Sequence, residues 1–379
     1  MAMKPQDKNK NLQYYSIDEV QQLFIHGRTN WPNDRKELPL FWNNSGVEVC
    51  TDGTELWIKV EADYSIYEPW YAVEVNGALV SRSMLQSGEN DICLFRGMSE
   101  GTVKRAFFYR DLQAMGQDDD CHMIVKGLYC DGEFKEVPQY DHRIEFIGDS
   151  ISSGEGTYGA GDDMDWIPMY MSSSHNYINM IAKKMNADVR IISQGGWGVY
   201  CSWDAVRKNN IPRIYDKICG LAHGEFNESL GAAKAYDSSD WQADAVVINL
   251  GTNDGTGIAA YNGSGGEVSA MADEPLGIME CEKAIINFLK KLRAYYPKAH
   301  LLWVYGMLGY DINANISRAI ADYMAETGDS NVAYLTLPNT LPGEYGSRMH
   351  PGKKSHEKAA NMIADYLNNK LQKYLKMPY

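Results

Sequence analysis

The hydrophobic pattern of the chain changes near residue 138. Between about residues 40 and 137, apolar and polar residues alternate in short stretches rich in β-branched and aromatic side chains, such as ELWIKVEA at 55–62 and TVKRAFFYR at 102–110. Turn pairs such as Asn76-Gly77 and Asp131-Gly132 separate them. Alternation with a period of two is typical of half-buried strands. This part therefore predicts about seven or eight strands in an antiparallel β-sandwich of the jelly-roll type.

After Pro138, continuous apolar stretches take turns with helical patterns. The apolar stretches lie at 143–147, 189–193, 245–250, 300–305 and 332–337. Helical periodicity follows in the intervals, for example at 281–297 and at 359–374. Strands that alternate with helices favour a parallel sheet covered on both faces. We therefore predict two domains, a β-sandwich at 12–138 and an α/β three-layer sandwich with a five-stranded parallel sheet at 139–379.

Composition narrows the range of partners. The 379 residues include 36 basic and 50 acidic side chains, which gives a net charge of −14. A negative surface repels phosphate backbones and anionic membranes, so neither nucleic acid nor a membrane is an expected partner. No apolar stretch approaches the roughly 20 residues that span a bilayer. No H-E-x-x-H sequence, phosphate loop or dinucleotide fingerprint occurs, and we expect no metal and no cofactor.

The N-terminal residues and the cysteines bear on the cellular location. The segment MAMKPQDKNKNLQYY is polar and lacks the apolar core of a secretory signal. The seven cysteines are odd in number and have no C-x-x-C spacing, which favours a reducing compartment. We therefore expect a cytoplasmic protein, or a secreted one if a signal has been removed.

Polar residues follow the predicted parallel strands where each strand ends. Gly148-Asp149-Ser150 follows the first, a glycine-rich segment at 194–198 the second, Asn253 the third, and His350 lies before the last helix. Ligands bind beyond the carboxyl ends of such strands. A hydroxyl, a base and several N–H donors are what acyl transfer requires. Taken alone, Ser150 also fits a helix cap and His350 a surface residue, but together they predict a nucleophile and its base.

The blocks G-D-S, G-x-x-G, G-x-N-D and a late histidine resemble the SGNH hydrolases. The resemblance implies a flavodoxin-like fold with Ser150 as nucleophile and His350 as general base. It also implies an oxyanion hole formed by the N–H of Ser150, the N–H of Gly198 and the side chain of Asn253. Gly196 takes the place of Gly198 if the alignment within GGWG is shifted.

A jelly-roll domain in front, together with GWG at 196–198 and YGM at 305–307, resembles carbohydrate esterase family two. This resemblance implies an acetyl xylan esterase-like enzyme that removes O-acetyl groups from acetylated plant polysaccharide or oligosaccharide. The expected substrate is an acetylated xylo-oligosaccharide or a related sugar ester. Two alternatives stay open, a short-chain lipid or thioester hydrolase with the same site and a non-catalytic carbohydrate-binding protein. The sugar, the acetyl position and the oligomeric state are not predicted.

The acid that usually orients the histidine is missing. The family pattern often ends in D-x-x-H, but Ser347 stands three residues before His350. A main-chain carbonyl can hold the second imidazole N–H in the same tautomer. We therefore predict a Ser–His dyad, with Glu344 or Asp311 as the alternative partner of the histidine.

Several aromatic residues near the motifs are candidate sugar contacts. They are Trp197, Trp303 and Tyr310, although Trp303 also fits a core position within its strand. In the first domain, Trp42, Trp57 and Trp70 are expected in the core or at the domain interface, with sugar binding as the alternative. The glycine-rich stretch 254–277 is interpreted as a loop, either a lid or a flexible insertion.

A second serine motif is rejected. Gly97-Met98-Ser99-Glu100-Gly101 fits the G-x-S-x-G elbow of α/β-hydrolases. That elbow requires a helix after the serine, whereas a strand pattern follows here. We therefore interpret the segment as a hairpin loop without a catalytic role.

Overall fold

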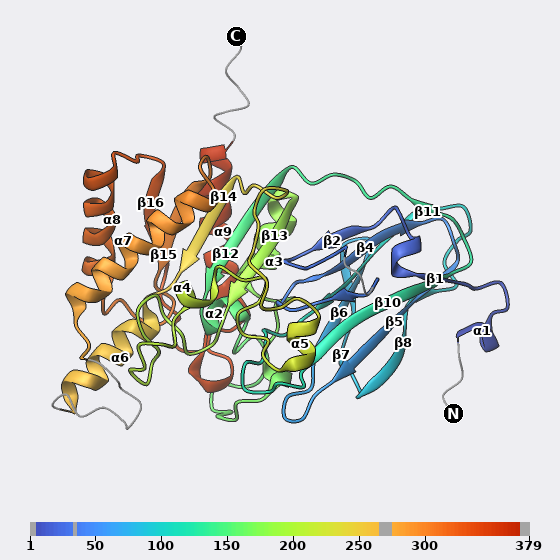
Figure 1. Cartoon of the computed structure of the whole chain (residues 1–379), viewed down its shortest axis with the longest axis horizontal. Helices are drawn as coiled ribbons and strands as arrows, with labels where there is room; N and C mark the ends of the chain where they lie inside the picture. Colours follow the sequence, from blue (N-terminus) through green and yellow to red (C-terminus); the bar gives the residue numbers. More distant parts are fainter. Residues whose placement is uncertain (1–4, 33–35, 265–274, 372–379) are drawn as a thin grey trace, which may run out of the picture. The chain divides into compact units, whose positions relative to one another are not determined.

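The computed structural model describes residues 5–32, 36–264 and 275–371 (Figure 1). The chain divides into two compact units. The first extends to Gln139 and includes Ile167–Met169 and Lys217–Tyr236, and the second contains the remaining residues from Tyr140 onward.

The first unit contains two antiparallel sheets. Its strands are β1 (Gln13–Ser16), β2 (Phe24–His26), β3 (Leu38–Pro39), β4 (Gly46–Thr51), β5 (Glu55–Asp63), β6 (Trp70–Val75), β7 (Ala78–Met84), β8 (Gly88–Arg96), β9 (Lys104–Arg110), β10 (His122–Cys130) and β11 (Phe134–Lys135). Its short helices are α1 (Pro5–Lys8), η1 (Ile17–Glu19) and α5 (Glu225–Ser229). One sheet has the order β1-β10-β5-β8 with β3 beside β10, and the other has the order β11-β4-β9-β6-β7 with β2 beside β4.

The alternating sequence pattern produces this sandwich directly. Along β5, Ile58 and Val60 are fully buried, whereas Lys59 between them is only half-buried. Asn76 and Gly77 both have positive φ, 51° and 81°, and they form the tight turn of the β6–β7 hairpin. The predicted antiparallel β-sandwich is confirmed, and each of the strand patterns expected between 40 and 137 forms a strand.

A segment from the middle of the sequence packs in the first unit. Lys217–Tyr236 belongs there, although the predicted boundaries assign these residues to the second domain. The indole Nε1 of Trp42 donates to the carbonyl of Ile218 at 2.7 Å. The Arg28 guanidinium lies 3.6 Å from the ring centroid of Tyr236. The 42–218 contact explains the complete burial of Trp42, which is a core residue.

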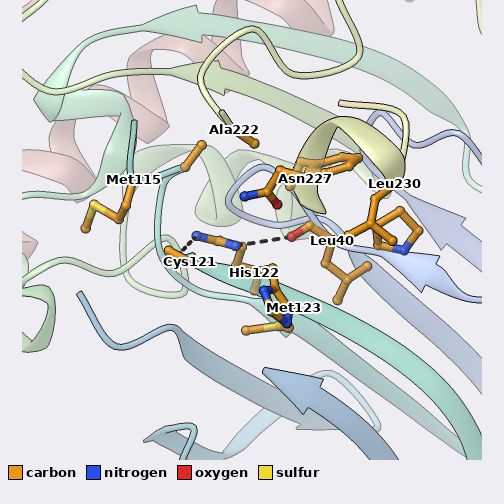
Figure 2. A pocket seen from close by; sticks show the side chains of 12 residues that line it. Leu40, Met115, Cys121, His122, Met123, Ala222, Asn227 and Leu230 are labelled. Carbon is orange, nitrogen blue, oxygen red and sulfur yellow. Dashed lines mark hydrogen bonds between the residues drawn. The ribbon is translucent and has the colours of Figure 1, made fainter. Parts of the chain in front are cut away.

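Figure 2 shows a small cavity of the first unit, lined by residues that include Leu40, Cys121 and Asn227. The buried Arg110 also lines it. Its guanidinium donates to the carbonyls of Leu40 at 3.3 Å and Gln113 at 3.1 Å. Carbonyl acceptors thus satisfy this buried cation, so its role is to join loops around the strands.

The second unit is built on a parallel sheet. Its strands are β12 (His142–Gly148), β13 (Ala187–Ser193), β14 (Ala245–Asn249), β15 (His300–Tyr305) and β16 (Val332–Thr336). Its helices are α2 (Ser150–Ser153), α3 (Tyr177–Met185), α4 (Ile211–Ile214), α6 (Thr252–Gly263), α7 (Ile278–Tyr295), α8 (Asn313–Thr327), η3 (Ser347–Met349) and α9 (Lys353–Leu371), and η2 (Pro168–Tyr170) lies at the unit boundary. The strand order β13-β12-β14-β15-β16 is flavodoxin-like, as predicted.

Helices cover both faces of this sheet. Ile144 and Phe146 of β12 share one buried cluster with side chains of α3 and α9. Glu145 points to the other face, where the hydroxyls of Tyr215 and Tyr296 donate to its carboxylate. The carboxyl ends of all five strands therefore meet at one edge, where the loops carry the predicted site. Within the described residues, no helix is long and apolar enough to cross a membrane.

Two local expectations were wrong. The stretch 254–277 was expected to be a loop, but residues up to Gly263 belong to the helix α6. Residues 265–274 of that stretch lie outside the described residues. Ser99 lies between β8 and β9 as expected, but these strands belong to different sheets and do not form a hairpin.

Candidate active site

Ser150 is placed by the sharp turn between β12 and α2. It is the first residue of α2, and Asp149 caps this helix through a 3.0 Å hydrogen bond from the Ile151 N–H. Gly148 is required just before the turn, because a Cβ there would overlap the Oγ of Ser152. The serine side chain is thus held at the carboxyl end of β12, which pairs with β13 and β14, and 7% of its surface is exposed.

His350 reaches Ser150 from the loop before α9. Its Nε2 lies 2.9 Å from the Oγ of Ser150, across 200 positions of sequence. Gly156 makes this approach possible, because a Cβ on it would lie 2.5 Å from the Cβ of His350. Its φ of +83° also favours glycine. The G-E-G sequence behind the serine therefore leaves the space that the histidine occupies.

The second nitrogen of the imidazole faces the main chain. Nδ1 lies 3.0 Å from the carbonyl oxygen of Arg348, an acceptor, so Nδ1 carries the proton and Nε2 holds the lone pair. Arg348 and Met349 have φ values of 56° and 55°. These two left-handed residues turn the carbonyl back toward the ring. The carboxylate Oε1 of Glu155 lies 3.8 Å from the same nitrogen.

The side chains expected near His350 do not take this place. Glu344 pairs instead with Lys358, Oε1 to Nζ at 2.5 Å. The hydroxyl of Ser347 is buried and has no hydrogen-bond partner among the described residues. Between Asp311 and His350, no hydrogen bond or ion pair is found in the described part of the chain. The geometry agrees with the predicted main-chain partner of the histidine.

Asn253 connects the serine turn with the glycine-rich loop. Its Nδ2 donates to the carbonyl of Trp197 at 3.1 Å and to Oδ2 of Asp149 at 3.3 Å. Asp149 precedes Ser150, and Trp197 follows Gly196. The amide therefore lies where the ends of three successive strands of the sheet come together.

The structure corrects the expectation for Gly198. Its N–H donates to the carbonyl of Cys201 at 2.9 Å, so it is occupied within its own loop. A Cβ on Gly198 would overlap the carboxylate of Asp254, which accepts the N–H groups of Val199 at 2.9 Å and Tyr200 at 2.7 Å. Gly198 is thus needed for packing. The N–H of Gly196 has no acceptor among the described residues, and Gly196 is the better candidate donor.

Two buried carboxyls, Asp149 and Asp254, lie beneath the site, and neither was predicted to have a role there. Burial raises the pKa of Asp149 to about 7, the charge of Asp254 adds to this, and the hydrogen bond from Ile151 opposes it. Burial also raises the pKa of Asp254 against three main-chain N–H groups. Asp254 follows Asn253 in the G-x-N-D block, and this adjacency is the signal that could have identified it.

The aromatic candidates divide into core and surface residues. Trp303 has no exposed surface, and its Nε1 donates to the carbonyl of Leu250, so the expectation that it contacts substrate is wrong. Trp197 is half-buried, and Tyr310 is 41% exposed with its hydroxyl bonded to the carbonyl of Leu337. Trp203 was not predicted from the sequence, but it is 58% exposed, and its Cδ1 lies 2.9 Å from a Cβ placed on Gly196. Its nearness to the GGWG block was the available signal.

These features are those of a hydrolase of the GDSL type. The GDSL-like Lipase/Acylhydrolase family matches residues 146–358, and the chain belongs to this family. The match covers every motif residue from the serine turn to the histidine. The predicted membership of the SGNH hydrolases, as a class of carboxylic ester hydrolase, is confirmed.

Individual relatives are similar over nearly the whole chain. The structure of an acetyl xylan esterase (Est2A) from the rumen bacterium Butyrivibrio proteoclasticus is 48% identical, covers 95% of this chain and 99% of that one, and has a TM-score of 0.89. A family two carbohydrate esterase from Clostridium thermocellum, solved with cellohexaose, shares the fold at 21% identity, with 92% and 99% coverage and a TM-score of 0.77. The predicted resemblance to family two is confirmed at the level of fold.

A curated relative is a longer protein. The Cellulase/esterase CelE of Acetivibrio thermocellus is 24% identical over 339 residues, which are 87% of this chain and 37% of that protein. The chain thus spans little more than a third of that relative's length.

Proposed function

We propose that this protein is a carbohydrate O-deacetylase, a serine esterase that removes acetyl groups from acetylated plant polysaccharide or oligosaccharide. The observation that carries the proposal is the 2.9 Å contact between Ser150 Oγ and a His350 Nε2 whose lone pair is directed by the Arg348 carbonyl. The similarity to Est2A, described as an acetyl xylan esterase, supports the substrate class.

In the acylation step, Ser150 Oγ attacks the acetyl carbonyl carbon while its proton passes to Nε2 of His350. The carbonyl oxygen becomes an oxyanion. When the tetrahedral intermediate collapses, the bond to the sugar oxygen breaks, and His350 returns the proton to that oxygen. The free sugar hydroxyl leaves, and the acetyl group stays on Ser150.

Water reverses these steps in deacylation. His350 takes a proton from water, the hydroxide oxygen attacks the acetyl carbon, and the bond to Ser150 Oγ breaks. The serine regains the proton from His350, and acetate leaves. The atoms of water, the ester and the two side chains account for every bond that forms or breaks.

We propose that the N–H of Ser150, the N–H of Gly196 and Nδ2 of Asn253 stabilise the oxyanion. The first two have no acceptor among the described residues. Asn253 has both its amide hydrogens engaged, and the 3.3 Å contact to Asp149 is the longer one. We assign the hydrogen that points to Asp149 to the oxyanion, so that Asp149 and the oxyanion share it. Asp149 thereby also fixes the orientation of the amide.

The sugar itself would contact the aromatic residues that are at least partly exposed. The indole of Trp203 lies across Gly196 and exposes 58% of its surface, and Trp197 and Tyr310 complete the set. Sugar rings stack on aromatic faces, which provide apolar area without demanding one hydroxyl pattern. Replacement of Trp203 by Ala should therefore raise KM for an oligosaccharide more than for 4-nitrophenyl acetate.

Acetate release from acetylated xylo-, manno- and gluco-oligosaccharides tests the proposal, with Ser150→Ala as the matched inactive variant. Deacetylation of at least one class that depends on Ser150 is the expected result. Faster turnover of octanoyl than acetyl esters would favour the lipid esterase alternative. Sugar binding without any ester hydrolysis would identify a non-catalytic binding protein.

Three further expectations remain proposals. The domain boundaries stay at 12–138 and 139–379, with Lys217–Tyr236 contributed to the first unit, and limited proteolysis tests them. We retain an acetylated xylo-oligosaccharide as the partner, without nucleic acid or membrane. The expected cytoplasmic location is tested by cell fractionation with an antibody against this chain.

A further inference from the structure

Glu155 lies between the serine segment and the histidine loop. It lies two residues after the end of α2, and its N–H donates to the carbonyl of Ser150 at 3.0 Å. Its side chain is buried, with 6% of its surface exposed. One oxygen, Oε1, accepts a 2.8 Å hydrogen bond from Nε of Arg348 and lies 3.8 Å from Nδ1 of His350. A single carboxylate oxygen thus faces both residues.

Arg348 is the residue whose carbonyl holds the imidazole. Its backbone lies in the left-handed region, and its N–H donates to the carbonyl of Asp163 at 2.7 Å. Its guanidinium is fixed by Glu155 and by a 3.0 Å bond from Nη1 to the carbonyl of Met164. The ion pair with Glu155 therefore anchors the turn from which His350 receives its hydrogen-bond acceptor.

We infer that Glu155 is a positioning residue that orients His350 through Arg348 and stabilises the positive charge His350 acquires when it takes the proton of Ser150. The inference rests on the proposed function. A carboxylate this close to an imidazole favours the charged form of the ring. Glu155 thus performs, from the segment behind the nucleophile, the electrostatic part of the role that D-x-x-H assigns to an acid near the histidine.

Other charged groups surround Glu155 and His350, and their effects on the titration of His350 must be distinguished from the effect of Glu155. The guanidinium of Arg348, with 34% of its side chain exposed, opposes the imidazolium. Asp149, which interacts with both Glu155 and Asp254, and the buried His356 also act on this region. Because Asp149 can titrate in the same pH range, a pH–rate profile alone does not isolate His350. A direct readout of the histidine is therefore required.

The decisive variant is Glu155→Gln, which keeps the shape and an oxygen for Arg348 but removes the charge. Glu344→Gln is the matched control, because it removes a carboxylate from the histidine loop that pairs with Lys358 instead. NMR of histidine-labelled protein follows the titration of His350, whose resonance is the one missing in His350→Ala. In Glu155→Gln the midpoint should fall by about 0.5–1 pH unit, and kcat should fall about 10–100-fold with little change in KM.

Removal of the positive charge of Arg348 should shift the titration of His350 in the opposite direction. Arg348→Gln should raise the midpoint of the His350 titration. A positive charge beside the ring is lost, and Arg348 no longer competes with the imidazole for the carboxylate of Glu155. If Glu155→Gln fails to fold, as judged by circular dichroism, this variant decides. An unchanged midpoint in the folded variants, or equal effects of Glu344→Gln, overturns the inference.

The test also distinguishes this inference from the proposed function. Reactivity toward a small organophosphate reports on Ser150 and His350 without any sugar substrate. If Ser150→Ala abolishes labelling and hydrolysis while Glu155→Gln changes neither the rate nor the midpoint, only the role of Glu155 is wrong. If Ser150→Ala retains hydrolysis, the proposed mechanism fails whatever the titration shows.

Discussion

Glu48 in the first unit and Asp149 in the second are buried carboxylates with opposite surroundings. In the first, Glu48 lies 3.3 Å from Nε2 of His26 and also accepts bonds from Arg105. Burial opposes its charge, but these two partners outweigh burial and lower its pKa to about 2. In the second, Asp149 accepts from neutral groups, the Ile151 N–H and the Asn253 amide, and burial raises its pKa to about 7.

This difference distinguishes a carboxylate that stabilises the fold from one that lies beneath the candidate site. The partners of Glu48 satisfy its charge within the fold of the first unit, so its role there is structural. A buried carboxyl held only by neutral donors is costly, and such groups gather at functional sites. Backbone strain also occurs beside the candidate site, because Arg348 and Met349 are consecutive left-handed residues and lie directly before His350.

The largest expected effect is loss of the dyad in the second unit. Ser150→Ala and His350→Ala should each lower kcat by about 10³-fold or more, and the double variant should lose little further activity, because the two act as one unit. Hydrolysis of 4-nitrophenyl acetate measures this. Ser99→Ala in the first unit is the control and should stay within about twofold. More than a tenth of the native rate in either variant would contradict the assignment.

Next in size is the loss of one oxyanion donor. Asn253→Ala should lower kcat by about 10²–10³-fold with little change in KM, because the interaction strengthens only in the transition state. Steady-state kinetics with an acetylated oligosaccharide separates the two constants. A rise of KM alone would place Asn253 in ground-state sugar binding.

A change in the first unit should affect stability and leave catalysis unchanged. Glu48→Gln removes the carboxylate that pairs with His26 and Arg105 and should lower the free energy of unfolding by about 2–3 kcal/mol. Denaturant titration measures this, and kcat per folded molecule should remain within about twofold. Glu89→Gln is the control, because Glu89 pairs with Lys59 at an exposed position and should cost less than about 1 kcal/mol. A loss of activity in Glu48→Gln at constant stability would contradict the conclusion that Glu48 has only a structural role.

Much of this architecture was predictable from local sequence patterns. The period of two in the first unit and the fully apolar strands in the second gave the correct classes of sheet, because side-chain burial sets both patterns. Ser150, Asn253 and His350 were predictable because each follows or precedes a regular element at the same sheet edge. Local pattern and residue type were sufficient for these positions.

Other features depend on long-range contacts that no local pattern records. Gly198 and Gly196 look alike in GGWG, and only the bond from Gly198 to Cys201 distinguishes them. Glu155 meets Arg348 across 193 positions. The placement of Lys217–Tyr236 in the first unit rests on contacts such as Trp42 to Ile218, which are likewise distant in sequence.

A smaller effect concerns acid stability of the second unit. His356 accepts the Tyr177 N–H at 3.2 Å, and burial lowers its pKa to about 3. Its stabilising contribution is present above the unfolded value near 6.5 and is lost as pH falls toward 3, because the unfolded chain binds the proton first. His356→Gln keeps an acceptor but does not titrate.

The stability difference between native protein and His356→Gln should therefore shrink by about 2 kcal/mol from pH 7 to pH 5. Denaturant unfolding at several pH values measures it. Asp149 acts in the opposite direction, since its raised pKa adds stability as pH falls from about 7 to 4. Asp149 contributes equally to both proteins, so its effect cancels in the difference between their free energies of unfolding. A difference that does not change with pH would show that His356 is not buried in its neutral form.

The smallest expected effect is at Ser347, the residue in the place of the usual acid. Its hydroxyl is fully buried without a partner among the described residues, while its carbonyl accepts the N–H of His350 at 3.1 Å. Ser347→Ala keeps that carbonyl and removes an unsatisfied polar group, so stability should stay equal or rise by about 1 kcal/mol. Activity should fall less than about tenfold, because a neutral hydroxyl gives an imidazolium little stabilisation. A loss of about 10³-fold would mean that the hydroxyl turns to Nδ1 during the reaction, as the triad acid does. In that case Ser347, rather than the Arg348 carbonyl and Glu155, would set the basicity of His350.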